Sequence, residues 1–214
     1  VTFIETSSGC TDDDDVTITV NPLDDATFTL TDYCEGSPNS ATVTGTSGGV
    51  FTFTTPPTGG ETINSVTGEI TGGIGGTTYD ITYSTAGICP QSSTETVTVN
   101  FLDDATFTLT DYCEGSPNSA TVTGTSGGVF TFTTAPTGGE TINSVTGEIT
   151  GGGGGTTYDV TYTTTGICPQ SSTETVTVNS LDDATFTLTD YCEGSLNSAT
   201  VTGTSGGVFT FTTA

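Results

Sequence analysis

A 79-residue repeat is the feature of this chain that most restricts how it can fold. The stretch LDDATFTLTDYC at residues 23–34 returns unchanged at 102–113 and at 181–192. Residues 23–101 and 102–180 differ at only six of their 79 positions. Repetition at a fixed period is typical of arrays in which one small structural unit recurs along the chain. We therefore expect such an array.

The repeat also defines the expected domain boundaries. Two whole copies occupy 23–101 and 102–180, and residues 181–214 begin a third copy. Residues 1–22 correspond to the end of a preceding copy, because Cys10 precedes its counterpart Cys89 by one period of 79 residues. A partial copy would leave half of a core exposed to water. We expect each partial copy to be completed, either by the same chain continuing or by a neighbouring copy of it.

Short runs of alternating apolar and polar residues predict strands throughout each copy. In the first whole copy the expected strands are 26–31, 41–44, 50–54, 61–63, 69–71, 77–83 and 96–99. Seven short strands separated by Gly, Pro, Asn and Ser predict an all-β protein, a tandem array of seven-stranded antiparallel Ig-like β-sandwiches. The expected core residues are Phe28, Leu30, Val43, Phe51, Phe53, Ile63, Ile70, Tyr79, Ile81, Val97 and Val99.

The charge composition excludes several classes of function. The chain contains 25 Asp and Glu residues but no Lys, Arg or His. Nothing in it can neutralise a phosphate, so we expect no binding to nucleic acid. No apolar run is long enough to predict insertion into a membrane. The usual bases and cationic groups of active sites are also missing, and near-identical units suggest no unique cleft, so we expect no enzymatic activity.

Paired aspartates at each boundary between copies suggest calcium sites. Ca²⁺ takes about six to eight oxygen ligands from several segments, and adjacent carboxylates suit it. Strand direction brings the loop after the first strand, and a later hairpin turn of the next copy, to the same junction. The expected ligands are Asp24, Asp25, Asp103, Asp104, Asp182 and Asp183, with Asp32, Glu35, Asp111, Glu114, Glu69 and Glu148. The alternative is that these carboxylates only keep the surface soluble.

A run of four aspartates, Asp12–Asp15, has no counterpart in later copies. It would serve as another cation site or, as such runs more often do, as a solvated loop. We favour the loop.

Two cysteine positions per copy predict disulfides and therefore a secreted protein. The cysteines are Cys10, Cys34, Cys89, Cys113, Cys168 and Cys192. One scheme joins the two cysteines of a copy, Cys34–Cys89 and Cys113–Cys168. Strand counting argues against it, since it puts Cys34 and Cys89 roughly one strand length (~20 Å) apart, whereas bridged Cα atoms lie within about 7 Å. The second scheme joins adjacent copies through Cys34–Cys168, and a third joins separate chains.

The hairpin INSVTGEI at 63–70, followed by TTYDITY at 77–83, resembles a signature of bacterial Ig-like and cadherin-like repeats. The whole unit, with Tyr33-Cys34 early and GICP at 87–90, is similar to the tandem repeats of giant secreted surface adhesins of gliding, Bacteroidetes-type bacteria. This resemblance implies an extracellular or cell-surface fibrous protein and transfers no catalytic residue.

Two functions follow from these features. The first is a structural subunit of an extracellular filament, stiffened by Ca²⁺ at the junctions and by disulfides, whose partner is another copy of itself. The alternative is an adhesin stalk or a glycan-binding module, for which Tyr33 is the one candidate surface aromatic per copy. Rows of alternating Thr are ordinary outward-facing strand residues, so we do not expect ice binding.

Overall fold

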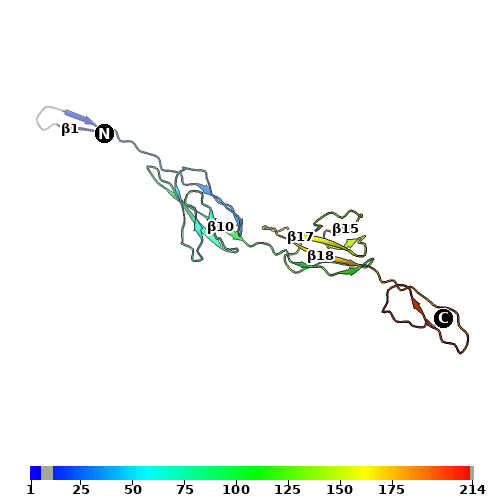
Figure 1. Ribbon diagram of the computed structural model, residues 1–214. Coiled ribbons are helices and arrows are strands. Elements are labelled where there is room, and N and C mark those ends of the chain that lie inside the picture. Colours follow the sequence, from blue (N-terminus) through cyan, green and yellow to red (C-terminus); the bar gives the residue numbers. More distant parts are fainter. Residues whose placement is uncertain (6–11, 213–214) are drawn as a thin grey trace. The chain divides into compact units, whose positions relative to one another are not determined.

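The computed structural model describes residues 1–5 and 12–212. The chain divides into two compact units, Val1–Leu102 and Asp103–Ala214, and each unit contains all the strands of one complete repeat (Figure 1). The described residues form strands and turns without any helix.

The larger layer of the first complete repeat is a four-stranded sheet. Its strands are β4 (Tyr33–Cys34), β6 (Val50–Phe53), β9 (Thr78–Ser84) and β10 (Ser92–Asn100). They lie in the order β4–β10–β9–β6. The pairs β10–β9 and β9–β6 are antiparallel, whereas β4 runs parallel to the end of β10, with Cys34 opposite Asn100.

Two small antiparallel sheets complete the first repeat. One pairs β3 (Phe28–Thr29) with β5 (Thr42–Val43), and the other pairs β7 (Thr62–Ile63) with β8 (Ile70–Thr71). We call the end of a repeat at which β10 begins the leading end and the end at which β10 finishes the trailing end.

The second complete repeat has the same topology. Its four-stranded sheet has the order β12–β18–β17–β14. The strands of this sheet are β12 (Tyr112–Cys113), β14 (Val129–Phe132), β17 (Thr156–Thr163) and β18 (Ser171–Asn179). The small sheets pair β11 (Phe107–Thr108) with β13 (Thr121–Val122), and β15 (Thr141–Ile142) with β16 (Ile149–Thr150).

Each core forms where the inward residues of these sheets meet. In β9 the alternation expected from the sequence is observed, because Tyr79, Ile81 and Tyr83 are buried while the residues between them are more exposed. Phe28 of a small sheet packs edge-on against Phe51 of the large sheet, with ring centroids 5.4 Å apart. Phe51 in turn contacts Tyr83 at 4.6 Å. The core therefore joins strands from the beginning, middle and end of the repeat.

Threonines on the outer face of the large sheet bond to one another across strands. The hydroxyls of Thr54 and Thr82 lie 2.7 Å apart, and those of Thr82 and Thr94 lie 3.1 Å apart. The second repeat has the same row at 2.7 and 3.0 Å. Cross-strand pairing of this kind is an ordinary means of sheet stabilisation and accounts for these threonines.

The partial copy at residues 181–212 shows how far burial depends on a complete repeat. It forms β19 (Phe186–Thr187) and β20 (Thr200–Val201). Phe186 is 47% exposed, whereas its counterpart Phe107 is 3% exposed. Tyr191 is 64% exposed, whereas Tyr112 is 9% exposed and lies in a strand. The same local sequence therefore needs the later strands of the repeat to bury its apolar side chains.

The segment before the first complete repeat forms a hairpin of β1 (Thr2–Glu5) and β2 (Asp12–Asp15). The aspartate run is thus a paired strand and not the loop that we favoured. Residues 16–20 are the equivalents of Glu95–Val99 in β10, yet they form no strand. Thr2 pairs with Asp15, one residue away from the register of the complete repeats, where Ile81 pairs with Glu95. Register is specified weakly where no face is buried, as in this exposed hairpin.

The structure confirms the expected fold class, an all-β chain of tandem Ig-like β-sandwich repeats. It differs in one detail, since each complete repeat has an eighth strand that the sequence did not suggest. This strand, Tyr33–Cys34, forms because Tyr33 enters the core next to Val99 while its backbone pairs with β10. The flanking Asp, Glu, Gly and Ser residues had favoured a loop.

The two environments of one local sequence provide a stability test. Phe51→Ala should lower the free energy of unfolding of the first repeat by about 3–5 kcal/mol, because it empties a well-packed site. The matched control is Phe209→Ala in the partial copy, where the equivalent ring is 53% exposed and should contribute much less. Hydrogen exchange would measure both effects. Equal losses in the two variants would contradict this account of the core.

Candidate binding site

The first aspartate of each expected calcium pair is bonded to the leading end of its own repeat. The backbone N–H of Asp24 donates to the Cys89 carbonyl at 3.0 Å, and its Oδ2 accepts from the Gly87 N–H at 2.9 Å. Asp103 makes the same two contacts, to the Cys168 carbonyl at 2.9 Å and from the Gly166 N–H at 3.0 Å. These carboxylates therefore close a loop by hydrogen bonding.

The second aspartate of each pair organises a turn. Asp25 Oδ1 accepts from the N–H of Thr27 at 3.0 Å and also from the Thr27 hydroxyl, and these bonds hold the pKa of Asp25 below its usual value. Hydrogen bonds from Thr106 lower the pKa of Asp104 in the same way. In the partial copy, Asp183 Oδ1 accepts from Thr185 N–H at 3.0 Å, while Asp182 is exposed.

The remaining aspartate of this group lies towards the other end of the repeat. Asp32 Oδ1 accepts from the Thr98 N–H near the end of β10 at 2.8 Å. Asp111 makes the equivalent contact with Thr177, also at 2.8 Å. Within one repeat, therefore, Asp32 is at the trailing end and Asp24 is at the leading end.

The described residues do not form a ready metal site. Across 1–5 and 12–212, no group of three or more Asp, Glu or Cys side chains is placed to hold a metal ion. Within each repeat, most of the aspartates expected as ligands already accept hydrogen bonds from backbone N–H groups. The expected junction site combines residues of two units and stays a prediction.

One carboxylate contact was missed from the sequence. Glu61 Oε1 accepts from the Tyr79 hydroxyl at 2.9 Å, and its Oε2 accepts from the Gly59 N–H at 3.0 Å. Hydrogen bonds from its own N–H and from Tyr79 lower the pKa of Glu61. Glu140 and Tyr158 repeat this contact at 3.0 Å. This contact could have been predicted from a carboxylate on one expected strand and an inward-facing tyrosine two strands later.

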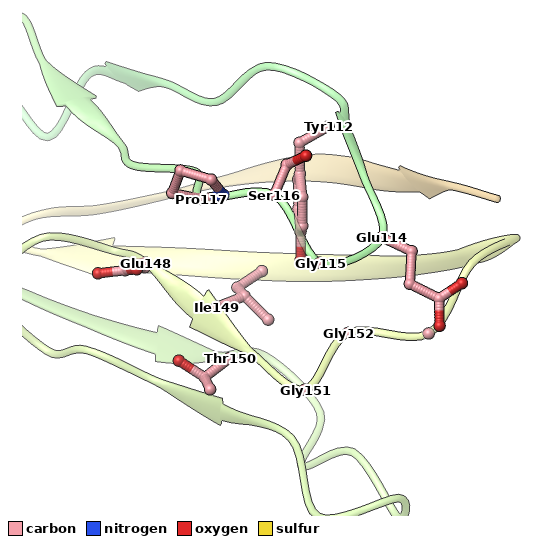
Figure 2. A pocket seen from close by; sticks show the side chains of 11 residues that line it. Tyr112, Glu114, Gly115, Ser116, Pro117, Glu148, Ile149, Thr150, Gly151 and Gly152 are labelled. Carbon is pink, nitrogen blue, oxygen red and sulfur yellow. The ribbon is translucent and has the colours of Figure 1, made fainter. Parts of the chain in front are cut away.

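The two glutamates expected as metal ligands line a pocket in each repeat. In the first repeat the pocket has a volume of about 550 Å³, and in the second about 510 Å³. Both volumes are in the range of small-molecule sites, about 300–1,000 Å³. The lining of the first includes Tyr33, Glu35, Ser37, Pro38, Glu69 and Ile70. The second is lined by the equivalents Tyr112, Glu114, Ser116, Pro117, Glu148 and Ile149 (Figure 2).

The carboxylates of this pocket are separated by its tyrosine. Figure 2 shows Glu114 and Glu148 on opposite sides of Tyr112, with Ile149 between Tyr112 and Glu148. Glu114 Oε2 lies against the glycine-rich segment, only 2.7 Å from the place that a Cβ on Gly154 would occupy. The carboxylates are thus placed to contact different parts of a ligand.

The tyrosine hydroxyl of the pocket is buried without a partner. Neither the Tyr33 hydroxyl nor the Tyr112 hydroxyl makes a hydrogen bond in the described part of the chain. A buried polar group without a partner typically costs about 1–3 kcal/mol. Burial raises the pKa of both tyrosines, so both stay protonated donors. Tyr33 was expected as a surface aromatic, but it is 8% exposed, so its ring does not form a stacking platform.

The cysteines do not pair within a repeat. Cys34 and Cys168 are disulfide-bonded, whereas Cys89, Cys113 and Cys192 are free thiols, and Cys10 lies outside the described residues. The pairs Cys34–Cys89 and Cys113–Cys168 are therefore not formed. The reason is the nine-residue strand β10, which spans roughly 26 Å between the end near Cys89 and the end next to Cys34. The alternative pair Cys34–Cys168 stays a prediction.

Comparison with known proteins adds little to this picture. The chain matches no protein-family model and no curated protein. It is similar to the solved structures of protocadherin gamma B2 extracellular cadherin domains 3–6 (11% identity, TM-score 0.32) and of the protocadherin gamma B4 extracellular domain (11%, TM-score 0.34). The alignments cover 81% and 78% of this chain but only 55% and 36% of those chains. TM-scores this low carry no conclusion about family or function.

The described residues contain no helix long and apolar enough to cross a bilayer.

The cysteine states can be checked directly. Alkylation of the native chain without reductant should modify Cys89, Cys113 and Cys192, and should leave Cys34 and Cys168 unmodified because they are oxidised. Peptide mapping by mass spectrometry without reduction would identify the partner of each oxidised cysteine. A peptide that joins Cys34 to Cys89 would contradict the separation of these residues along β10.

Proposed function

We propose that this chain is a structural segment of an extracellular filament built from tandem Ig-like repeats. The observation that carries the proposal is the self-contained repeat, because two copies of one 79-residue sequence close the same core with the same polar contacts. A spacer is lengthened by adding identical units, whereas a single active site or recognition tip needs a unique one.

The connection between successive repeats is short, and this supports a role as a spacer. β10 ends at Asn100, and Asp103 is already hydrogen-bonded within the second repeat. Only Phe101 and Leu102 separate these two residues, and so short a linker leaves little freedom. Disulfide-bonded cysteines favour an oxidising compartment outside the cytosol. The resemblance to bacterial surface adhesins supports a place at the cell surface.

We further propose that the disulfide joins successive repeats through Cys34 and Cys168. Cys34 lies at the trailing end of its repeat, and Cys168 lies at the leading end of the next repeat, where its carbonyl accepts from Asp103. Cys113 and Cys89 are the equivalent positions that remain as thiols. In a longer array, each would find its partner in the following or the preceding repeat.

The partner of this chain is proposed to be its own repeat sequence. The partial copy exposes Phe209 and Phe211, while Phe51 and Phe130, the equivalents of Phe209, are 2% exposed in the complete repeats. Exposed apolar residues beside open strand edges favour association with further strands. Either the same chain continues or another copy supplies the strands, and the structure is compatible with both.

Assembly provides the test of this function. The 214-residue chain should associate at micromolar concentration in sedimentation velocity and form fibres in electron micrographs. Phe209→Ser with Phe211→Ser should weaken association, because it removes the apolar face of the partial copy. Val66→Ser with Val145→Ser is a matched control, since both valines are 78% exposed on complete repeats. A monomer under all these conditions would defeat the proposed self-association.

Calcium at the junctions is a separate hypothesis. With a formal net charge of −25, the chain needs cations for screening in any case. A calcium site is therefore identified only by a loss of stability that occurs when calcium is removed at constant ionic strength. If the site exists, chelation at constant ionic strength should lower the melting temperature. Asp103→Ala alone does not discriminate, because it also removes the bond to Gly166. The decisive result is whether the chelator still has an effect in that variant, and an unchanged melting curve of the native chain would exclude the site.

A further inference from the structure

Of the three inward-facing tyrosines of each complete repeat, one is unlike the others. The Tyr83 hydroxyl donates to the Thr46 carbonyl at 2.8 Å, and the Tyr79 hydroxyl donates to Glu61 at 2.9 Å. Among the described residues, the Tyr33 hydroxyl has no hydrogen-bond partner, and neither does the Tyr112 hydroxyl in the second repeat. The same unpaired donor thus occurs twice, each time in the lining of the pocket described above.

The carboxylates of the repeat show a similar division. Five of the eight accept a hydrogen bond from the protein: Asp24, Asp25, Asp32, Glu61 and Asp80. Among the described residues, the side chains of Glu35, Glu69 and Glu95 have no such bond. Two of these three line the same pocket as the tyrosine whose hydroxyl is unpaired, and the second repeat divides in the same way.

The unused groups restrict the chemistry of a ligand. The carboxylates need hydrogen-bond donors, and the protonated tyrosine needs an acceptor. An ammonium group offers donors only and would leave the tyrosine unpaired. A metal ion is not favoured, because the described residues contain no suitable group of ligands. A sugar hydroxyl both donates and accepts, and it needs no positive charge in the protein.

The rest of the lining suits the same class of ligand. Ser37 and Thr71 add two hydroxyls, and Pro38 and Ile70 add apolar surface for the C–H groups of a sugar ring. Mostly apolar walls with a few directed polar groups are typical of small-molecule sites. The tyrosine hydroxyl lies beneath Gly73, since a Cβ there would be 2.3 Å from it. A ligand would reach this hydroxyl only if the glycine-rich segment, which carries no side chain at Gly72 or Gly73, moved aside.

We propose that this pocket is a binding site for a neutral saccharide, present once in every complete repeat. Glu35 and Glu69 would accept from sugar hydroxyls, and Tyr33 would donate to one. Glu114, Glu148 and Tyr112 would do the same in the second repeat. This activity goes beyond the filament role and does not require it. An array would carry many such sites, so weak single contacts would add to a stronger attachment.

The test uses the full 214-residue chain and both of its pockets. A glycan array of neutral oligosaccharides built from glucose, galactose, mannose and N-acetylglucosamine identifies a binder, and calorimetry then measures its affinity. The double variant Tyr33→Phe with Tyr112→Phe should bind at least about tenfold more weakly, a loss of about 1.4 kcal/mol. Its melting temperature should stay the same or rise, because the variant removes a buried hydroxyl that has no partner in the folded chain.

Two further variants separate the pocket from the general charge of the chain. Glu35→Gln with Glu114→Gln should weaken binding. Glu95→Gln with Glu174→Gln should leave it unchanged, because these carboxylates are also unpaired but lie outside the pocket. The proposal is overturned if no neutral oligosaccharide binds at millimolar concentration or if the tyrosine variant binds as tightly as the native chain. It is equally overturned if only an oligolysine peptide binds, since that would show a simple charge interaction.

Discussion

Closure of one aromatic cluster is the constraint on which each repeat depends. Phe28, Phe51 and Tyr83 come from three separate parts of the 79-residue sequence, and their rings contact one another in the core. In the described part of the partial copy, residues 181–212, only the ring contact between Phe186 and Phe209 remains, with centroids 5.0 Å apart and both rings half exposed. A strand of this protein is therefore buried only when strands from the far end of the repeat cover it, and the whole repeat is the unit of stability.

The absence of basic residues gives the carboxylates an unusual role. In a protein with Lys and Arg, carboxylates can form ion pairs. In this chain most of them accept hydrogen bonds from backbone N–H groups and hydroxyls. Glu95 illustrates a different use, because it lies opposite Ile81 on the core side of the sheet yet is exposed. An inward charge on an unpaired strand edge discourages wrong association of sheets.

Prediction from the sequence succeeded where local pattern and burial agree. Alternation identified β9 and the inward positions Tyr79 and Ile81, and glycine and proline marked the turns. It failed for β4, since Tyr33 and Cys34 stand among turn-forming residues and are held by pairing with the distant β10. The pocket was not predicted either. Glu35 and Glu69 were assigned to calcium from strand direction, and the meeting of Glu69 with Tyr33 and Glu35 in one pocket follows from packing between distant segments.

The amino-acid sequence by itself determined the period, the all-β class, the acidic surface and most of the core, because these depend on composition and on alternation within a strand. Only the tertiary structure decided which ends of the repeat meet. It placed Tyr33 and Cys34 beside the end of β10 and directed Asp24 to Gly87. It also left the Tyr33 hydroxyl buried without a hydrogen-bond partner among the described residues, and it brought Tyr33 into the lining of one pocket with Glu35 and Glu69. These relations join residues tens of positions apart, and their geometry depends on strand order and direction, which no local pattern encodes.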